Sequence, residues 1–121
     1  MTLSTTEGYR ALLVPADPDL PVHEIVIADT GDSGLADLRR RIDCNYVEHV
    51  TGPSCSLWVD EEGAVSDPPQ RPNPRVDRLL MRSDGWSIRG NVVITGRTRP
   101  DGSTGSLPAE DAARLMKELT R

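Results

Sequence analysis

Four prolines crowd the middle of this chain and set the first limit on its fold. They stand at positions 68, 69, 72 and 74, and because proline lacks a backbone N–H, residues 66–74 cannot form regular structure until the segment ends. Ten prolines and ten glycines among 121 residues, with two Trp, two Tyr and no Phe, predict a turn-rich fold with an aliphatic core. A chain of this length forms a single domain, residues 1–121, in which residues 1–8 are expected to be flexible.

Short apolar runs predict about five strands. Residues 9–15 are mostly apolar and residues 22–27 alternate in hydrophobicity, which together indicate a β-hairpin. Residues 46–50 and 55–60 indicate two further strands joined by a turn. Residues 88–96 have the highest β-propensity in the chain and indicate a central strand.

Three segments carry the apolar spacing of helices: residues 34–43, residues 75–81, and a final segment that begins at Ser106. The predicted capping residues are Asp32 or Ser33 for the first helix and Asn73, followed by Pro74, for the second. Each helix has a single apolar stripe, so the sequence predicts an α+β domain with a mostly antiparallel sheet of about five strands and two or three helices packed on it.

The arrangement of these helices bears on assembly. We expect the helix at 34–43 and the C-terminal helix to cover one face of the sheet, with the helix at 75–81 covering the other face only in part. Trp58 and Trp86 are the bulkiest side chains near the apolar surface that this leaves. Such a surface favours a homodimer.

Charge and terminal composition limit the setting of the protein. Fourteen basic and 19 acidic residues give a net charge of −5, so the overall field does not steer the protein toward nucleic acid. Residues 1–8 lack the apolar run of a secretory signal, and no stretch approaches the roughly 18 apolar residues of a membrane span. We therefore expect a cytoplasmic protein in which Cys44 and Cys55 are free thiols.

Cysteine and histidine supply the soft ligands of this sequence. Cys44, Cys55, His23 and His49 could complete a tetrahedral zinc site, but the cysteines lack the close spacing that zinc sites favour. Cys44 could also act as a nucleophile with His49 or His23 as its base. Buried small thiols and half-exposed strand histidines are the simpler interpretation of all four residues.

Other motifs also fall short of known chemistry. The carboxylates at 60–62 are consecutive and lack the alternate spacing of a calcium loop. The glycine loop at 31–34 has neither the lysine of a P-loop nor the pattern of a dinucleotide site. The sequence therefore predicts no catalytic, cofactor-binding or metal-binding residue, and no enzyme.

One cationic stripe is a candidate contact surface. Arg75, Arg78 and Arg82 recur at helical spacing, and Arg71 stands just before them. Such a stripe could grip phosphates or an acidic partner, and the arginines at 39–41 would form a second patch. The competing interpretation is the polar face that any short surface helix needs. The stripe also lacks the interleaved aromatic side chains of single-stranded nucleic-acid sites.

Three motifs together resemble a known family. They are Trp-Val-Asp-Glu-Glu-Gly at 58–63, Pro-Asn-Pro-Arg at 72–75 and Ile-Arg-Gly-Asn-Val-Val-Ile-Thr-Gly at 88–96, followed by a C-terminal helix with an acidic start. With an opening strand that ends in Val14-Pro15, they resemble small phage, plasmid and actinobacterial proteins catalogued as domain of unknown function 3846. The resemblance covers nearly the whole chain and implies an accessory protein of a phage or other mobile element.

The resemblance and the lack of a catalytic constellation together predict a non-enzymatic protein that acts by binding an unknown host or phage protein. The alternative is a nucleic-acid-associated regulator that uses Arg71, Arg75, Arg78 and Arg82. A third hypothesis is an enzyme built on Cys44 and His49.

Overall fold

The structure is a computed structural model that describes residues 8–52, 54–80 and 87–120. Within these residues the order of elements is β1 (Gly8–Val14), β2 (His23–Ala28), α1 (Leu35–Ile42), β3 (Val47–Thr51), β4 (Ser56–Asp60), α2 (Pro74–Leu79), β5 (Val92–Thr95) and α3 (Ala109–Leu119). Residues 1–7, Arg82 and Trp86, all named in the predictions above, lie outside the described part. Gly8, which was expected to be flexible, begins β1.

The strands form one antiparallel sheet in the order β2-β1-β5-β4-β3. The hairpins β1–β2 and β3–β4 lie on either side of β5, which is buried along its whole length. The predicted α+β class and the central position of this strand are therefore confirmed. The strand is shorter than predicted because the backbone of residues 88–90 hydrogen-bonds to residues 71–73 and Gly90 adopts a φ of +87°.

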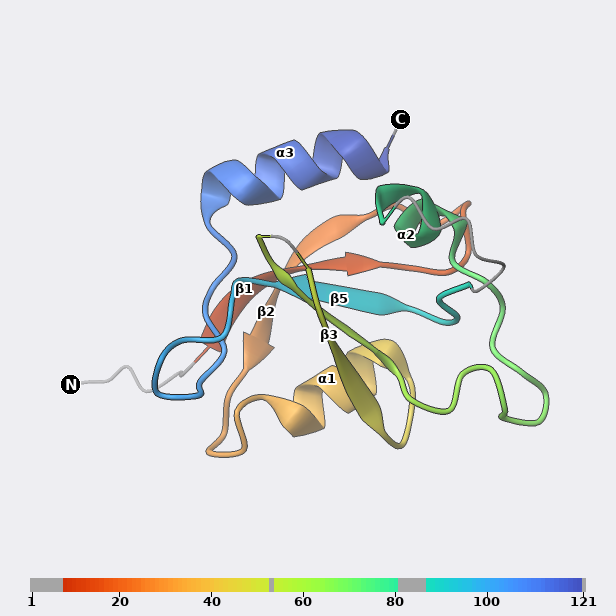
Figure 1. The fold of residues 1–121 in the computed structure, drawn as a ribbon, viewed down its shortest axis with the longest axis horizontal. Coiled ribbons are helices and arrows are strands. Elements are labelled where there is room, and N and C mark those ends of the chain that lie inside the picture. The colour runs from red at the N-terminus through yellow and green to blue at the C-terminus, as the bar shows by residue number, and fades with distance from the viewer. Residues whose placement is uncertain (1–7, 53, 81–86, 121) are drawn as a thin grey trace.

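The helices cover both faces of the sheet, with α1 on one side and α2 and α3 on the other (Figure 1). Leu38 and Ile42 of α1 pack with Ala11, Ile27 and Val93. On the opposite face of the sheet, Leu115 and Leu119 of α3 pack in one cluster with Leu12 of β1, Leu57 of β4 and Ile94 of β5. The prediction that α1 and α3 share one face is wrong, because the central strands are apolar on both faces and each face requires its own helical layer.

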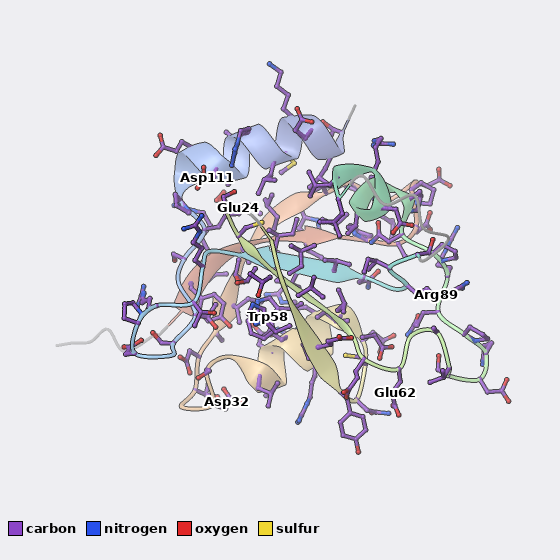
Figure 2. All side chains as sticks on the ribbon, in the orientation of Figure 1. Glu24, Asp32, Trp58, Glu62, Arg89 and Asp111 are labelled. Atoms are coloured by element: carbon purple, nitrogen blue, oxygen red, sulfur yellow. The ribbon has the colours of Figure 1, made fainter. Side chains whose placement is uncertain are left out.

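This layering changes the basis for the homodimer prediction. The prediction assumed an apolar sheet face left open, whereas both faces carry a helical layer. Trp58 is half-buried on the α1 side (Figure 2), and its Nε1 donates a hydrogen bond of 2.9 Å to Thr95 Oγ1. The homodimer stays a prediction, and it needs a surface other than the faces of the sheet.

Asn73 anchors the end of the proline segment to the sheet. The side chain is fully buried, and its Nδ2 donates to the carbonyls of Val14 and Gly90 over 3.0 Å each. Its Oδ1 accepts from Val76 N at 3.4 Å at the start of α2, with Pro74 at the first helical position. The predicted cap is confirmed, and the same side chain also fastens α2 to β1.

The start of α1 depends on Asp32. Its carboxylate accepts hydrogen bonds from Gly34 N at 3.0 Å and Ala36 N at 2.9 Å. These bonds, that from Ala36 above all, lower the pKa of Asp32. Neither predicted capping residue is the N-cap, which is Gly34 and has no side chain to cap the helix. Asp32 bonds the first-turn amide of Ala36 from outside the helix, while Ser33 occupies a left-handed conformation with φ of 61°.

Candidate functional site

The arginine stripe at α2 is largely engaged within the protein. Arg75 Nη2 donates to the carbonyls of Pro15 and Asp17 at 2.7 and 3.0 Å, and burial lowers the pKa of its guanidinium. Arg71 lies 3.8 Å from a carboxylate oxygen of Asp17, and Arg78 Nη2 donates to the carbonyl of Leu119 at 3.5 Å. The three described arginines therefore hold the β1–β2 connection and the end of α3.

The two cysteines lie on opposite faces of the sheet. Cys44 packs at the edge of the α1 cluster, whereas Cys55 is buried in the cluster under α3. Burial, assisted by the charge of Asp60, raises the pKa of Cys44 to about 11, and burial also raises the pKa of Cys55. Both thiols are therefore protonated near neutral pH, which disfavours either as a nucleophile.

The histidines are equally dispersed. His23 lies on β2, with Nδ1 3.1 Å from the carbonyl of Pro21, and His49 lies on β3, at the other edge of the sheet. His49 stacks on Trp58 with ring centroids 4.6 Å apart. Within the residues that the structure describes, no three of the His, Cys, Asp and Glu side chains are placed to hold a metal ion.

The outer edge of β2 is covered in part by side chains of α1. Ala28 N–H donates to Asp37 Oδ2 over 2.8 Å, and Arg41 Nη2 donates to the carbonyl of Val26 over 3.4 Å. Asp37 is buried and also forms an ion pair with Arg40. Burial alone would raise the pKa of Asp37, but the bond from Ala28 and the two arginine charges outweigh it and lower the pKa. The predicted second patch at 39–41 thus serves partly to close this edge.

The opposite edge is formed by β3, and the bonds at its two ends fix how its backbone is oriented. Glu61 N–H donates to the carbonyl of Tyr46 over 2.9 Å, and Gly52 N–H donates to the carbonyl of Cys55 over 2.8 Å. Tyr46 and Gly52 therefore direct these groups toward the β4 side. In an antiparallel ladder, inward-facing and outward-facing residues alternate.

This alternation leaves one side of β3 open. Glu48 and Val50 direct their N–H and C=O groups toward β4, whereas Val47, His49 and Thr51 direct theirs away from the sheet. No described residue forms a hydrogen bond with these outward groups. The strand contains neither Pro nor Lys, two devices by which proteins protect a sheet edge. Among the residues that the structure describes, β3 therefore presents an unpaired edge that can accept another strand.

A hollow lies beside β3 on each face of the sheet. On the α2 side, a hollow of about 230 Å³ is lined by Glu48, Val50, Val59, Glu61, Ile88 and Arg89 among others. On the α1 side, a hollow of about 320 Å³ is lined by His49, Thr51, Cys55, Ser56, Arg97 and Thr98. The side chains of a strand placed on this edge would point alternately into the two hollows.

Sequence reasoning found the strand but missed its exposed edge. Residues 46–50 were predicted as a strand, yet nothing local shows that β5 pairs with β1 and β4 and so leaves β3 outermost. One local signal existed: Glu48 and His49 are adjacent polar residues on opposite faces of β3, as expected for a strand exposed on both sides.

Two comparisons with known proteins give a match. The family model described as Domain of unknown function (DUF3846) matches residues 10–120. The crystal structure of the small RNA methyltransferase HEN1 is similar, with a TM-score of 0.59 and 14% sequence identity over 93% of this chain. This chain corresponds to only 16% of that one, and at this identity the likeness concerns the fold alone. No curated protein matches the chain.

Proposed function

The chain belongs to the DUF3846 family, and from this membership we propose that it is a non-enzymatic accessory protein that binds a partner protein through the open edge of β3. The observation that carries the proposal is the row of main-chain groups on Val47, His49 and Thr51, to which no described residue bonds. A partner segment in extended conformation would pair with these groups and become the sixth strand of the sheet.

In strand addition, the backbone and the side chains of the bound segment contribute differently to recognition. Main-chain hydrogen bonds supply affinity, and hollows that receive alternate side chains supply specificity. The edge of β3 has both, since a hollow lies on each face beside it. At the edge of β2, side chains of α1 already bond two of the outward groups, the N–H of Ala28 through Asp37 and the carbonyl of Val26 through Arg41, so that row is interrupted.

The chemistry of the thiols supports a binding role over an enzymatic one. An enzyme built on Cys44 and His49 would need a thiolate, and the raised pKa of Cys44, about 11, disfavours it. We propose a cytoplasmic setting and, as the family resemblance implies, a place in the accessory equipment of a phage or other mobile element. No helix among the described residues is long and apolar enough to cross a membrane.

The alternative is nucleic-acid binding by the arginine stripe. Arg75 and Arg78 line a hollow of about 340 Å³ together with Pro18, Pro21 and Leu119, which favours an anion there. The support for this alternative is weaker than that for strand addition, because Arg75 Nη2 already donates to the carbonyls of Pro15 and Asp17. Such binding would weaken steeply with added salt and would be unaffected by changes to β3.

Two variants of His49 test the proposed function. His49→Pro removes the central outward N–H and places the proline ring where a partner strand would pair. His49→Ala, the matched control, loses the same stacking on Trp58 but keeps the N–H. In pull-downs from host lysate, we expect the partner to be retained by the wild type and by His49→Ala and lost with His49→Pro.

Two results would contradict this proposal. If folded His49→Pro captures the same protein as the wild type, the partner does not pair with β3. If the purified protein turns over a substrate, the non-enzymatic assignment is wrong. The urea midpoint of each variant shows whether the fold is intact before capture is compared.

A further inference from the structure

The hollow on the α2 side of β3 has an apolar floor and an acidic rim. Val50 and Val59 lie on neighbouring strands, and Ile88 closes the floor, while Glu48 and Glu61 stand at the rim. A long side chain with an apolar stem and a cationic head matches this arrangement, because Lys and Arg lay their stems on apolar surface while the charge stays in water.

The charges around this hollow are unbalanced. Glu48 and Glu61 are exposed, and neither side chain forms a hydrogen bond or ion pair with a described residue. The cation of the lining, Arg89, is held by the carbonyl of Gln70, to which its Nη1 donates over 3.0 Å. Arg89 lies at the same end of the molecule as Glu62, a further carboxylate (Figure 2).

The register of an added strand follows from the orientation of β3. In an antiparallel pairing, the partner residue opposite His49 exchanges main-chain hydrogen bonds with it. The next residue lies opposite Glu48 and the preceding one opposite Val50, both on the α2 side of the sheet. Directly opposite side chains of unlike charge stabilise such a pair, and like charges destabilise it.

From this register we infer that the partner of β3 is a basic, extended peptide segment, with Lys or Arg opposite Glu48 and an apolar residue opposite Val50. The inference rests on the proposed function, because it assigns the chemistry of the strand that the open edge accepts. Going along the partner from its N-terminus, the apolar residue precedes the basic one by two positions.

A second copy of this chain fits the edge less well. Antiparallel pairing of two β3 strands about His49 would bring the two Glu48 side chains diagonally together on one face of the joined sheet. Each copy also carries a net charge of −5, and this repulsion opposes association. Charge complementarity therefore selects a basic peptide over self-pairing.

The other face of the partner strand meets polar groups. Partner side chains opposite His49 and Thr51 would face the hollow that Ser56, Arg97 and Thr98 also line. Small hydroxyl side chains suit that surface and also favour the extended conformation when they are threonines. This choice gives the probe peptide Thr-Val-Thr-Arg-Thr, labelled with fluorescein through a Gly-Gly spacer, and a twin with Glu in place of Arg.

Fluorescence anisotropy of these two probes, with the protein titrated at low salt, tests the inference. The wild type should bind the Arg probe at least about fivefold more tightly than the Glu probe, the ratio expected when an attractive exposed pair is replaced by a repulsive one. Glu48→Lys should reverse the order. Asp19→Lys makes the same charge change on an exposed residue of the β1–β2 connection, at the opposite edge of the sheet, and should retain the wild-type order.

The outcomes separate this inference from the proposed function. If both probes bind equally and both are lost with His49→Pro, strand addition stands and the basic preference is overturned. If neither probe binds and the wild type sediments as a dimer that His49→Pro dissociates, the occupant is a second copy and the inference is overturned. If His49→Pro binds the Arg probe as well as His49→Ala does, the proposed function itself fails.

Discussion

Replacing Asn73 by alanine is expected to lower the free energy of unfolding by about 3–5 kcal/mol, since each buried polar group left without a partner costs about 1–3 kcal/mol and a lost helix cap about 1 kcal/mol. The variant would leave the carbonyls of Val14 and Gly90 and the amide of Val76 without their present partner. Urea denaturation of both proteins at neutral pH measures the difference.

Two companion variants sharpen this result. Asn73→Asp keeps an acceptor for the α2 amide but cannot donate to the two carbonyls, so it should be nearly as destabilising as alanine. Asn45→Ala changes an exposed asparagine and should alter stability by no more than about 0.5 kcal/mol. A loss below about 1 kcal/mol for Asn73→Ala would show that these bonds do not anchor the proline segment.

Neighbouring proline substitutions in β3 are expected to differ sharply in their effect on stability. Val50→Pro removes an N–H that faces β4 and directs the proline ring toward Leu57, its fully buried cross-strand partner. We expect the free energy of unfolding to fall by about 2–4 kcal/mol, because a carbonyl of β4 loses its donor and the ring clashes with the neighbouring strand. His49→Pro keeps every bond to β4 and loses the stacking on Trp58, about 1 kcal/mol.

Urea denaturation of the two proline variants, together with Val50→Ala, measures this contrast. The alanine variant shows how much of the Val50→Pro effect comes from the lost side chain alone. If His49→Pro destabilises the protein as much as Val50→Pro, the outward orientation assigned to His49 is wrong. If Val50→Pro is no worse than Val50→Ala, the inward orientation of Val50 is wrong.

The parts of the fold that depend on neighbouring residues could be predicted from the sequence. Asn73 and Pro74 have the side chains that begin a helix, and the predicted cap is present at α2. The other two bonds of Asn73 join residues 59 and 17 positions away in the chain. No local pattern indicates such contacts, so the role of Asn73 in fastening α2 to β1 could not be predicted.

The candidate site depends on strand order, which local patterns do not encode. The turn residues at 51–54 indicate strands on either side of them, residues 46–50 and 55–60. Only the insertion of β5 between the two hairpins makes β3 an edge. The arginine stripe shows the same limit. Helical spacing groups Arg75 with Arg78, whereas the carbonyl of Pro15 that Arg75 binds lies 60 residues away along the chain.

Hydrogen exchange of the β3 amides, followed residue by residue by NMR, tests the open edge most directly. In the free protein, the amides of Glu48 and Val50 should exchange slowly and those of Val47, His49 and Thr51 rapidly, because only the first two face β4. On saturation with the Thr-Val-Thr-Arg-Thr probe, the three outward amides should become protected. Outward amides that are already protected in the free protein, or that stay rapid when the probe is bound, would contradict strand addition at β3.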